Sequence, residues 1–217
     1  MVSKRKEKKQ ERLIEKDLVK IILFGVVLVI LYFLASYYFK SLNQFEYQGL
    51  SFTRERFDRD TLYHYYYYYT KPSGQIIQYN LYLHIDPRTN NVTIQGDPLL
   101  LEKPYVYLTY DDSFPDSCRF VGSSVVDFNL FLKQNQITVF SGITNETKAQ
   151  ETNQDHITCE SKPDSVEVFE FHAGNETSVA VTSNCHRVYI GPDCGVRDAV
   201  EKLKVEIIKQ ARERALN

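Results

Sequence analysis

The chain has 217 residues, of which 43% are apolar and 25% charged, and a formal net charge of −2. This balance is typical of a globular protein, and it excludes a collagen-like or disordered chain and a large multidomain assembly. The charge is unevenly distributed. Residues 1–20 hold eight Lys and Arg against four Asp and Glu, residues 21–39 hold no charge, and residues 41–217 hold 17 Lys and Arg against 24 Asp and Glu.

Residues 21–39 form an uncharged stretch of 19 residues between Lys20 and Lys40. As a helix it would be about 28 Å long, close to the roughly 30 Å of a bilayer's hydrocarbon layer. We therefore predict one transmembrane helix at 21–39. The alternatives are a buried soluble helix and a cleaved signal peptide, but signal peptides have shorter apolar regions and a better cleavage site than Ala35-Ser36.

The basic residues flanking this stretch predict its orientation. Eight precede it, against four that follow it over a similar length. Because basic residues favour the cytoplasmic side, we expect a cytoplasmic tail at 1–20 and an extracytoplasmic domain at 41–217, anchored in the cell membrane. Nucleic acid is a poor fit as a partner, because the basic run is short and lacks interleaved aromatic residues.

The four cysteines, Cys118, Cys159, Cys185 and Cys194, all follow the apolar stretch. An even number on that side indicates two disulfides in an oxidising compartment. Four cysteines allow three connectivities, and we favour Cys185–Cys194 with Cys118–Cys159, because a strand end and the start of the next helix lie close together. A free Cys194 at a helix start would be a reactive thiolate, which is the less favoured interpretation.

Three glycosylation sequons also follow the apolar stretch, beginning at Asn91, Asn145 and Asn175. Each adjoins a predicted turn, where a glycan has room. We expect a glycoprotein, in agreement with the predicted topology.

The first half of the outer domain reads as strands at 46–57, 62–70, 75–85 and 92–95, separated by turn residues. This order predicts an antiparallel β-meander, with a possible domain boundary near residues 96–104.

The second half mixes strands and helices. We expect strands at 105–110, 137–140, 165–172, 178–182 and 186–190, and a bulge within 165–172, where the alternation changes register. A helix at 125–134 would be capped by Ser124, and residues 142–155 read as a polar loop. A terminal amphipathic helix would be capped by Asp193, and its apolar stripe would consist of Val196, Val200, Leu203, Ile207 and Ala211. The predicted fold is α+β, a β-meander (41–100) joined to an α/β layer (101–217).

The most unusual motif is a run of tyrosines in the strand at 62–70. Alternation places Tyr63, Tyr65, Tyr67 and Tyr69 on one face and Tyr66 and Tyr68 on the other. If one face packs on the core, the other exposes rings suited to stacking on sugars, peptides or another subunit. The alternative is that tyrosine is simply a good strand former.

Evidence for catalysis is weak. Asp111, Asp112 and Asp116 follow a strand and are candidate oxygen ligands for a divalent cation, although a solvated acidic loop is the simpler interpretation. Neither a nucleophile elbow, a zinc-protease pair, a phosphate loop nor a dinucleotide fingerprint is present. We assign no catalytic residue and expect no cofactor.

Three segments carry a resemblance: residues 45–52, the segment 79–83 leading to Asp86-Pro87-Arg88, and the unit from Cys185 through Cys194 into the terminal helix. Together they resemble a group of uncharacterised single-pass membrane proteins of small-genome archaea. The resemblance implies an archaeal cell surface. It transfers no catalytic residue, because that group has no assigned activity.

These observations favour a non-enzymatic binding or envelope-assembly module whose partners are the lipid bilayer and an envelope protein or glycan. Two alternatives stay open. One is an extracytoplasmic enzyme such as a metal-assisted hydrolase, and the other is an accessory subunit of a membrane complex.

Overall fold

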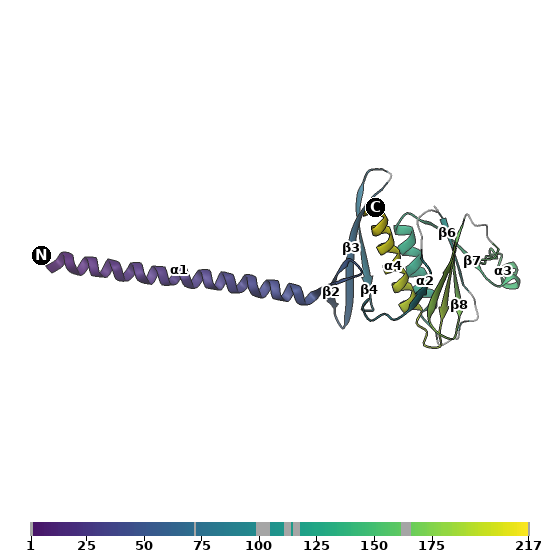
Figure 1. Ribbon diagram of the computed structural model, residues 1–217, viewed down its shortest axis with the longest axis horizontal. Helices are drawn as coiled ribbons and strands as arrows, with labels where there is room; N and C mark the ends of the chain where they lie inside the picture. The colour runs from purple at the N-terminus through teal and green to yellow at the C-terminus, as the bar shows by residue number, and fades with distance from the viewer. Residues whose placement is uncertain are drawn as a thin grey trace. The chain divides into compact units, whose positions relative to one another are not determined.

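The computed structural model describes residues 2–71, 73–98, 105–110, 114, 118–161 and 166–216, with side chains described between residues 18 and 214. The chain divides into two compact units, Met1–Phe45 and Glu46–Asn217 (Figure 1). The predicted metal ligands Asp111, Asp112 and Asp116 lie outside the described residues.

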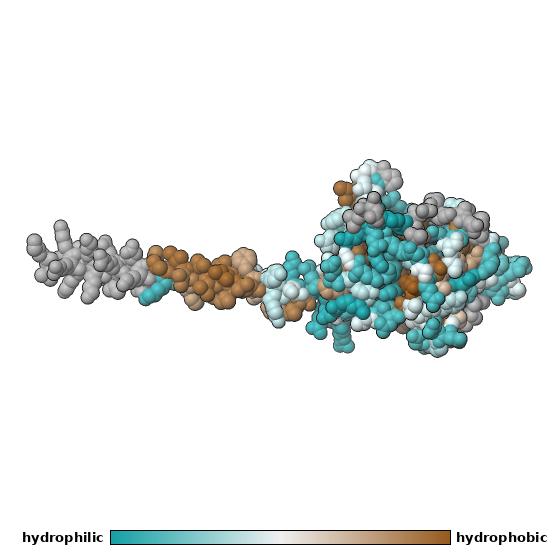
Figure 2. Space-filling view, in the orientation of Figure 1, coloured by the Kyte–Doolittle hydropathy of each residue, from teal (hydrophilic) through white to brown (hydrophobic). Residues whose placement is uncertain are grey.

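The first unit consists mainly of one continuous helix, α1 (Val2–Asn43). Its segment Leu18–Asn43 is apolar and long enough to cross a membrane, and it contains the predicted span at 21–39. Ile21 is 72% exposed and Tyr37 76% exposed, and Figure 2 shows hydrophobic surface along most of this part of the helix. So much exposed apolar surface is unfavourable in water and is suited to a membrane anchor.

The second unit begins with an antiparallel four-stranded sheet in the order β1-β2-β3-β4. Its strands are β1 (Gln44–Tyr47), β2 (Leu50–Phe57), β3 (Asp60–Thr70) and β4 (Ile76–Leu83). The sequence predicted one strand at 46–57, but the chain turns back at Gln48 and Gly49, whose φ angles are 50° and 75°. Two consecutive residues at positive φ make the tight hairpin that separates β1 from β2.

The other sheet is mixed and has six strands in the order β5-β9-β10-β8-β6-β7. They are β5 (Thr93–Gln95), β6 (Tyr105–Tyr110), β7 (Thr138–Ile143), β8 (Glu167–Ala173), β9 (Ser178–Thr182) and β10 (Cys185–Ile190). Strands β7, β6, β8 and β10 run parallel, and β9 is antiparallel to β10. The short strand expected to extend the meander, β5, instead pairs with β9 in this sheet.

Two helices, α2 (Val121–Gln134) and α4 (Val196–Leu216), lie between the sheets (Figure 1). On one side Phe131 of α2 contacts Tyr79 of β4, with ring centroids 6.0 Å apart. On the other side Phe128 contacts Phe169 of β8 at 5.0 Å. The α+β class and the predicted antiparallel sheet are confirmed, and the later strands belong to a mixed sheet.

Because α4 is covered from both sides, it buries more than the single apolar stripe that the sequence predicted. Even Glu201 (3% exposed) and Lys204 (2% exposed) are buried. The Glu201 carboxylate accepts hydrogen bonds from the backbone amides of His84 (2.9 Å) and Ile85 (3.0 Å), and Lys204 donates to Asp127 on α2. These polar side chains therefore tie α4 to the chain after β4 and to the neighbouring helix.

Both predicted helix caps are wrong. Helix α2 starts at Val121, and Ser124 is buried within it rather than capping it. Helix α4 starts at Val196, three residues after Asp193, whose carboxylate accepts a hydrogen bond from the Thr177 hydroxyl at 2.9 Å. Local sequence identified residues able to cap, but tertiary contacts placed them elsewhere.

Two further expectations, a polar loop at 142–155 and a bulge within 165–172, are wrong. The region expected to be a polar loop contains α3 (Glu146–Thr152), capped by the Asn145 side chain, which accepts from the Lys148 amide at 3.1 Å. The bulge expected in β8 does not form, because the strand keeps one register against both neighbours. Both faces of β8 are buried, so apolar residues occur in both alternation phases without a register change.

Two disulfides form as predicted, but the favoured connectivity is wrong. The pairs are Cys118–Cys194, with Cα atoms 5.2 Å apart, and Cys159–Cys185, at 5.4 Å. Cys185 begins β10, and Cys194 follows its far end. Since a six-residue strand is about 20 Å long, these two cysteines are too far apart to bond.

Candidate functional site

The tyrosines of β3 divide between two faces, as alternation predicted. Tyr65 is 9% exposed and faces the interior, where its ring lies 5.5 Å from that of Phe52. Tyr66 is 52% and Tyr68 61% exposed, with their rings in edge contact at 5.9 Å. The exposed row and the inward row are therefore both aromatic.

The inward row lines a cavity of about 480 Å³ between β3 and the two helices. Apolar side chains dominate the lining, and it lies within the second unit. The cavity residues are Tyr65, Tyr67, Tyr68 and Tyr69 of β3, Phe131 of α2, Ile207, Ile208, Ala211 and Arg212 of α4, and Asn135 and Ile137; of these, Tyr68 belongs to the exposed row. A volume of this size is within the range of small-molecule sites.

Hydrogen bonds fix the tyrosine hydroxyls at the cavity wall. The Tyr67 hydroxyl donates to the Asn135 side-chain oxygen, and the Tyr69 hydroxyl donates to the Gln134 carbonyl oxygen at 2.7 Å. With the hydroxyls engaged at the end of α2, the rings present their apolar faces to the cavity.

Tyr65 and Tyr67 remain neutral over the physiological pH range. Burial raises the pKa of Tyr67 far above its ordinary value of 10.0, and nearby tyrosines, first Tyr79, add to this effect. Burial also raises the pKa of Tyr65, against the lowering effect of the Arg212 charge. The cavity therefore offers aromatic surface without a phenolate, which suits an uncharged apolar group.

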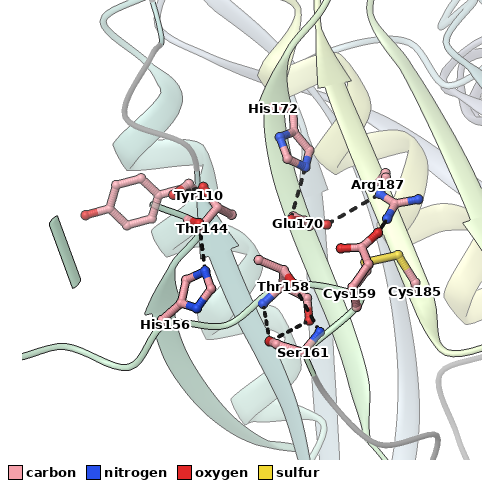
Figure 3. A network of polar contacts seen from close by, with 11 residues as sticks. Tyr110, Thr144, His156, Thr158, Cys159, Ser161, Glu170, His172, Cys185 and Arg187 are labelled. Atoms are coloured by element: carbon pink, nitrogen blue, oxygen red, sulfur yellow. Dashed lines mark hydrogen bonds and ion pairs between the residues drawn. A yellow bond between two sulfur atoms is a disulfide. The ribbon is translucent and has the colours of Figure 1, made fainter. Parts of the chain in front are cut away.

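A second cluster lies around Glu170 of β8, on the face of the mixed sheet that points away from α2 and α4 (Figure 3). Its carboxylate is 3.3 Å from His172 Nε2 and 3.5 Å from Arg187 Nε, and Arg187 also pairs with Glu160. Figure 3 shows these side chains beside the Cys159–Cys185 disulfide.

The electrostatics of this cluster favour a structural role. Burial alone would raise the pKa of Glu170, but hydrogen bonds from His172 and the Cys159 amide, with the charges of His172 and Arg187, hold the pKa below its ordinary value. The carboxylate is thus ionised and neutralised by its neighbours. The sulfur atoms of Cys159 and Cys185 lie within 4.8 Å of this carboxylate, a spacing that would suit a metal, but they are bonded to each other.

A buried histidine lies on the helix side of the same sheet. His186 of β10 is fully buried and stacks on Phe169, with ring centroids 4.2 Å apart. Its Nε2 is 3.9 Å from a Glu167 carboxylate oxygen, and among the described residues neither ring nitrogen has a hydrogen-bond partner. Burial lowers the pKa of His186 to about 4, so the ring is neutral at physiological pH.

The three predicted glycosylation sites, Asn91, Asn145 and Asn175, are exposed. Asn145 additionally caps α3. Exposure provides room for a glycan, and glycosylation stays a prediction.

A comparison of the chain with protein families, with curated proteins and with solved structures found no match. A function for this chain is therefore inferred from its own residues alone. Of the cavity residues on α4, Ile207 and Ala211 belong to the predicted apolar stripe, whereas Ile208 and Arg212 were missed by sequence reasoning. Ile208 lies outside the predicted stripe, and its burial at 6% exposure shows that α4 packs on more than one side.

Proposed function

We propose that this protein is a membrane-anchored, extracytoplasmic, non-enzymatic binding module that holds an apolar group in the tyrosine-lined cavity. The cavity between β3, α2 and α4 is the observation that carries the proposal. The apolar helix Leu18–Asn43 supplies the anchor, and two disulfides are typical of a domain in an oxidising compartment.

The chemistry of the cavity defines what it would bind. Its walls are mainly aromatic and aliphatic, Tyr65 and Tyr67 are neutral, and the hydroxyls of Tyr67 and Tyr69 are already hydrogen-bonded to the chain. An uncharged ligand gains the burial of apolar area and aromatic contact here. Arg212 is the charged residue of the lining, and its guanidinium donates to the Gly49 carbonyl oxygen. The ligand class is therefore an apolar chain or ring, free or part of a larger envelope molecule.

The orientation belongs to the same proposal. Eight basic residues precede the apolar stretch, so the short tail lies in the cytoplasm and residues 41–217 lie outside. The predicted glycosylation sites, and the resemblance to uncharacterised single-pass membrane proteins of small-genome archaea, agree with this placement. The enzyme alternative is less favoured for the cluster around Glu170, since this carboxylate is held ionised in ion pairs with His172 and Arg187.

Photolabelling of the full chain in lipid bilayers tests the binding proposal. The probe is 3-(trifluoromethyl)-3-phenyldiazirine, a small uncharged aromatic reagent, with peptide mapping of the labelled sites. We expect label in α1 from the lipid and a second set of labelled sites on β3 and on residues 207–212. The α1 label is an internal standard within the same molecule.

Two cavity-filling variants, Ala211→Phe and Ile208→Phe, should remove the label from β3 and α4 while leaving the α1 label unchanged. Tyr66→Ala is the matched control, because Tyr66 lies on the exposed face of the same strand. Labelling that survives both cavity-filling variants, or that is lost in Tyr66→Ala alone, would overturn the assignment of the cavity as the binding site.

A further inference from the structure

A second aromatic surface lies on the four-stranded sheet, on the face opposite the cavity. Tyr65 of β3 points to the interior, so its neighbours along the strand point to the other face. Directly opposed residues of antiparallel strands share a face. We call this face the outer platform, and its three rows pair β3 with β4: His64 with Tyr82, Tyr66 with Asn80, and Tyr68 with Gln78.

The rings of the outer platform are accessible and held in place. Tyr66 is 52%, Tyr68 61% and Tyr82 42% exposed. The Tyr66 ring contacts that of Tyr68 in edge geometry, and the Tyr82 ring stacks on His64 with ring centroids 4.5 Å apart. Because neighbouring side chains already fix these rings, a ligand that lies on them orders few side chains and loses little affinity to that cost.

Hydrogen bonds also fix the two exposed amides of the platform. Asn80 Oδ1 accepts from Gln78 Nε2 at 2.8 Å and lies 3.0 Å from His64 Nε2. Gln78 Oε1 in turn accepts from the Tyr68 hydroxyl at 3.2 Å. A carboxamide can form four hydrogen bonds, and within the described part of the chain each of these two forms only two. The remaining donors and acceptors are therefore oriented and available to a ligand.

The charge of this face excludes an anionic partner. Residues 61–70 and 76–83, which supply both strands of the platform, contain no Asp, Glu, Lys or Arg. On the neighbouring strand β2, the Glu55 carboxylate lies 2.7 Å from His64 Nδ1. A face with a carboxylate beside it and no lysine or arginine in its two strands does not attract nucleic acid, anionic lipid or an acidic sugar. Charge complementarity therefore favours a neutral ligand.

The pairing of a ring with a polar side chain in every row selects the class of neutral ligand. A lipid chain or an apolar peptide surface would cover the amides of Gln78 and Asn80 without replacing their bonds to water, which is unfavourable. An extended peptide binds at a strand edge, where backbone groups are free, rather than across a paired face. A sugar satisfies both parts of each row, because the face of its ring carries C–H groups and its rim carries hydroxyls.

We propose that the outer platform binds a neutral saccharide chain, whose rings stack on Tyr66 and Tyr82 and whose hydroxyls bond to Asn80 and Gln78. Its three rows extend over about 13 Å, because residues on one face of a strand are about 6.6 Å apart. The occupant is therefore an oligosaccharide or a segment of a polysaccharide, longer than one sugar. Tyr66 and Gln78 lie outside the cavity lining, so this site is independent of the apolar site proposed above.

Saturation-transfer NMR of the full chain tests this assignment, because it detects the weak binding expected of an open site. The protein is solubilised in a phosphocholine detergent, which has no sugar headgroup to compete. The probes are the neutral hexasaccharides of glucose, mannose, galactose and N-acetylglucosamine, with hexagalacturonate as the charged counterpart. We expect transfer to the ring C–H protons of at least one neutral probe and none to hexagalacturonate. Absence of transfer to all four neutral probes would overturn the proposal.

Three variants locate the site and identify its ligand class. Tyr66→Ala should weaken binding of the neutral probe about tenfold, whereas Tyr110→Ala, a 40% exposed tyrosine of the mixed sheet, is the matched control and should leave it unchanged. Gln78→Leu should weaken a saccharide about fivefold but strengthen an apolar partner.

Equal losses in the two tyrosine variants, or binding that Gln78→Leu leaves unchanged or strengthens, would refute a saccharide site on this face. A last comparison replaces the detergent with phosphatidylcholine nanodiscs, in which we expect the same affinity for the neutral probe. Binding that disappears in nanodiscs would show that the membrane surface, rather than a sugar, occupies the platform.

Discussion

The disulfide connectivity makes the sharpest prediction about stability. The bridge Cys118–Cys194 joins residues 76 apart in sequence, and Cys159–Cys185 joins residues 26 apart. In the chain-entropy model, closing these loops destabilises the unfolded state by about 4.5 and about 3.5 kcal/mol respectively at 25 °C. Replacing Cys118 and Cys194 with alanine should therefore lower the free energy of unfolding by about 1 kcal/mol more than replacing Cys159 and Cys185.

Urea unfolding of the two double-alanine variants measures this difference. A third variant, with Cys185 and Cys194 both replaced, separates the observed connectivity from the alternative suggested by the sequence. It breaks both bridges in the observed structure, so it should be several kcal/mol less stable than either matched pair. If the variant lacking Cys185 and Cys194 is destabilised by no more than the loss of a single disulfide, then Cys185 and Cys194 are partners, and the fold described around β10 is wrong.

Three further predictions concern buried polar groups. Asp127→Ala should cost about 1–3 kcal/mol, because it leaves the buried Lys204 ammonium without the half-exposed carboxylate that accepts from it. Adding Lys204→Met should restore much of this stability in urea unfolding, and additive effects of the two substitutions would contradict the prediction. Because the pKa of His186 is lowered to about 4 in the folded state, the unfolded chain binds the proton first, so the free energy of unfolding should fall by about 3 kcal/mol between about pH 6.5 and pH 4. His186→Phe should remove that part of the pH dependence, and an unchanged profile would show that His186 is not buried as described. Glu201→Ala leaves the two backbone amides after β4 without their acceptor, so it should lower the free energy of unfolding by about 3 kcal/mol in thermal or urea unfolding. Glu201→Gln should lower it by about half as much. An unchanged free energy of unfolding in Glu201→Ala would show that these hydrogen bonds do not hold α4 to the chain after β4.

The features predicted correctly from sequence follow from local periodicity. The uncharged stretch at 21–39 lies within the long apolar helix, and the alternation along β3 correctly assigned Tyr65 and Tyr66 to opposite faces of the strand. Strand and helix types follow from such patterns because burial of one face imposes a fixed repeat.

The features that were missed depend on contacts distant in sequence. Disulfide partners follow from which strand ends are adjacent, and β5 joins the mixed sheet through β9, about 85 residues later. The cavity was missed for the same reason, since its α4 wall adds Ile208 and Arg212 to tyrosines more than 130 residues earlier. Helix caps failed because Ser124 and Asp193 found tertiary partners or burial instead.

The position of α4 between two sheets has a consequence for how the domain is assembled. Both sheets precede this helix in the chain, yet neither can cover its inner surface until the helix has been synthesised. Glu201 reaches back 117 residues to His84, and Lys202 reaches back 155 residues to Tyr47. Contacts between residues so far apart in sequence form slowly, so the early strands stay prone to aggregation during translation. Until the final helix docks, the surface of these strands that α4 later covers stays exposed.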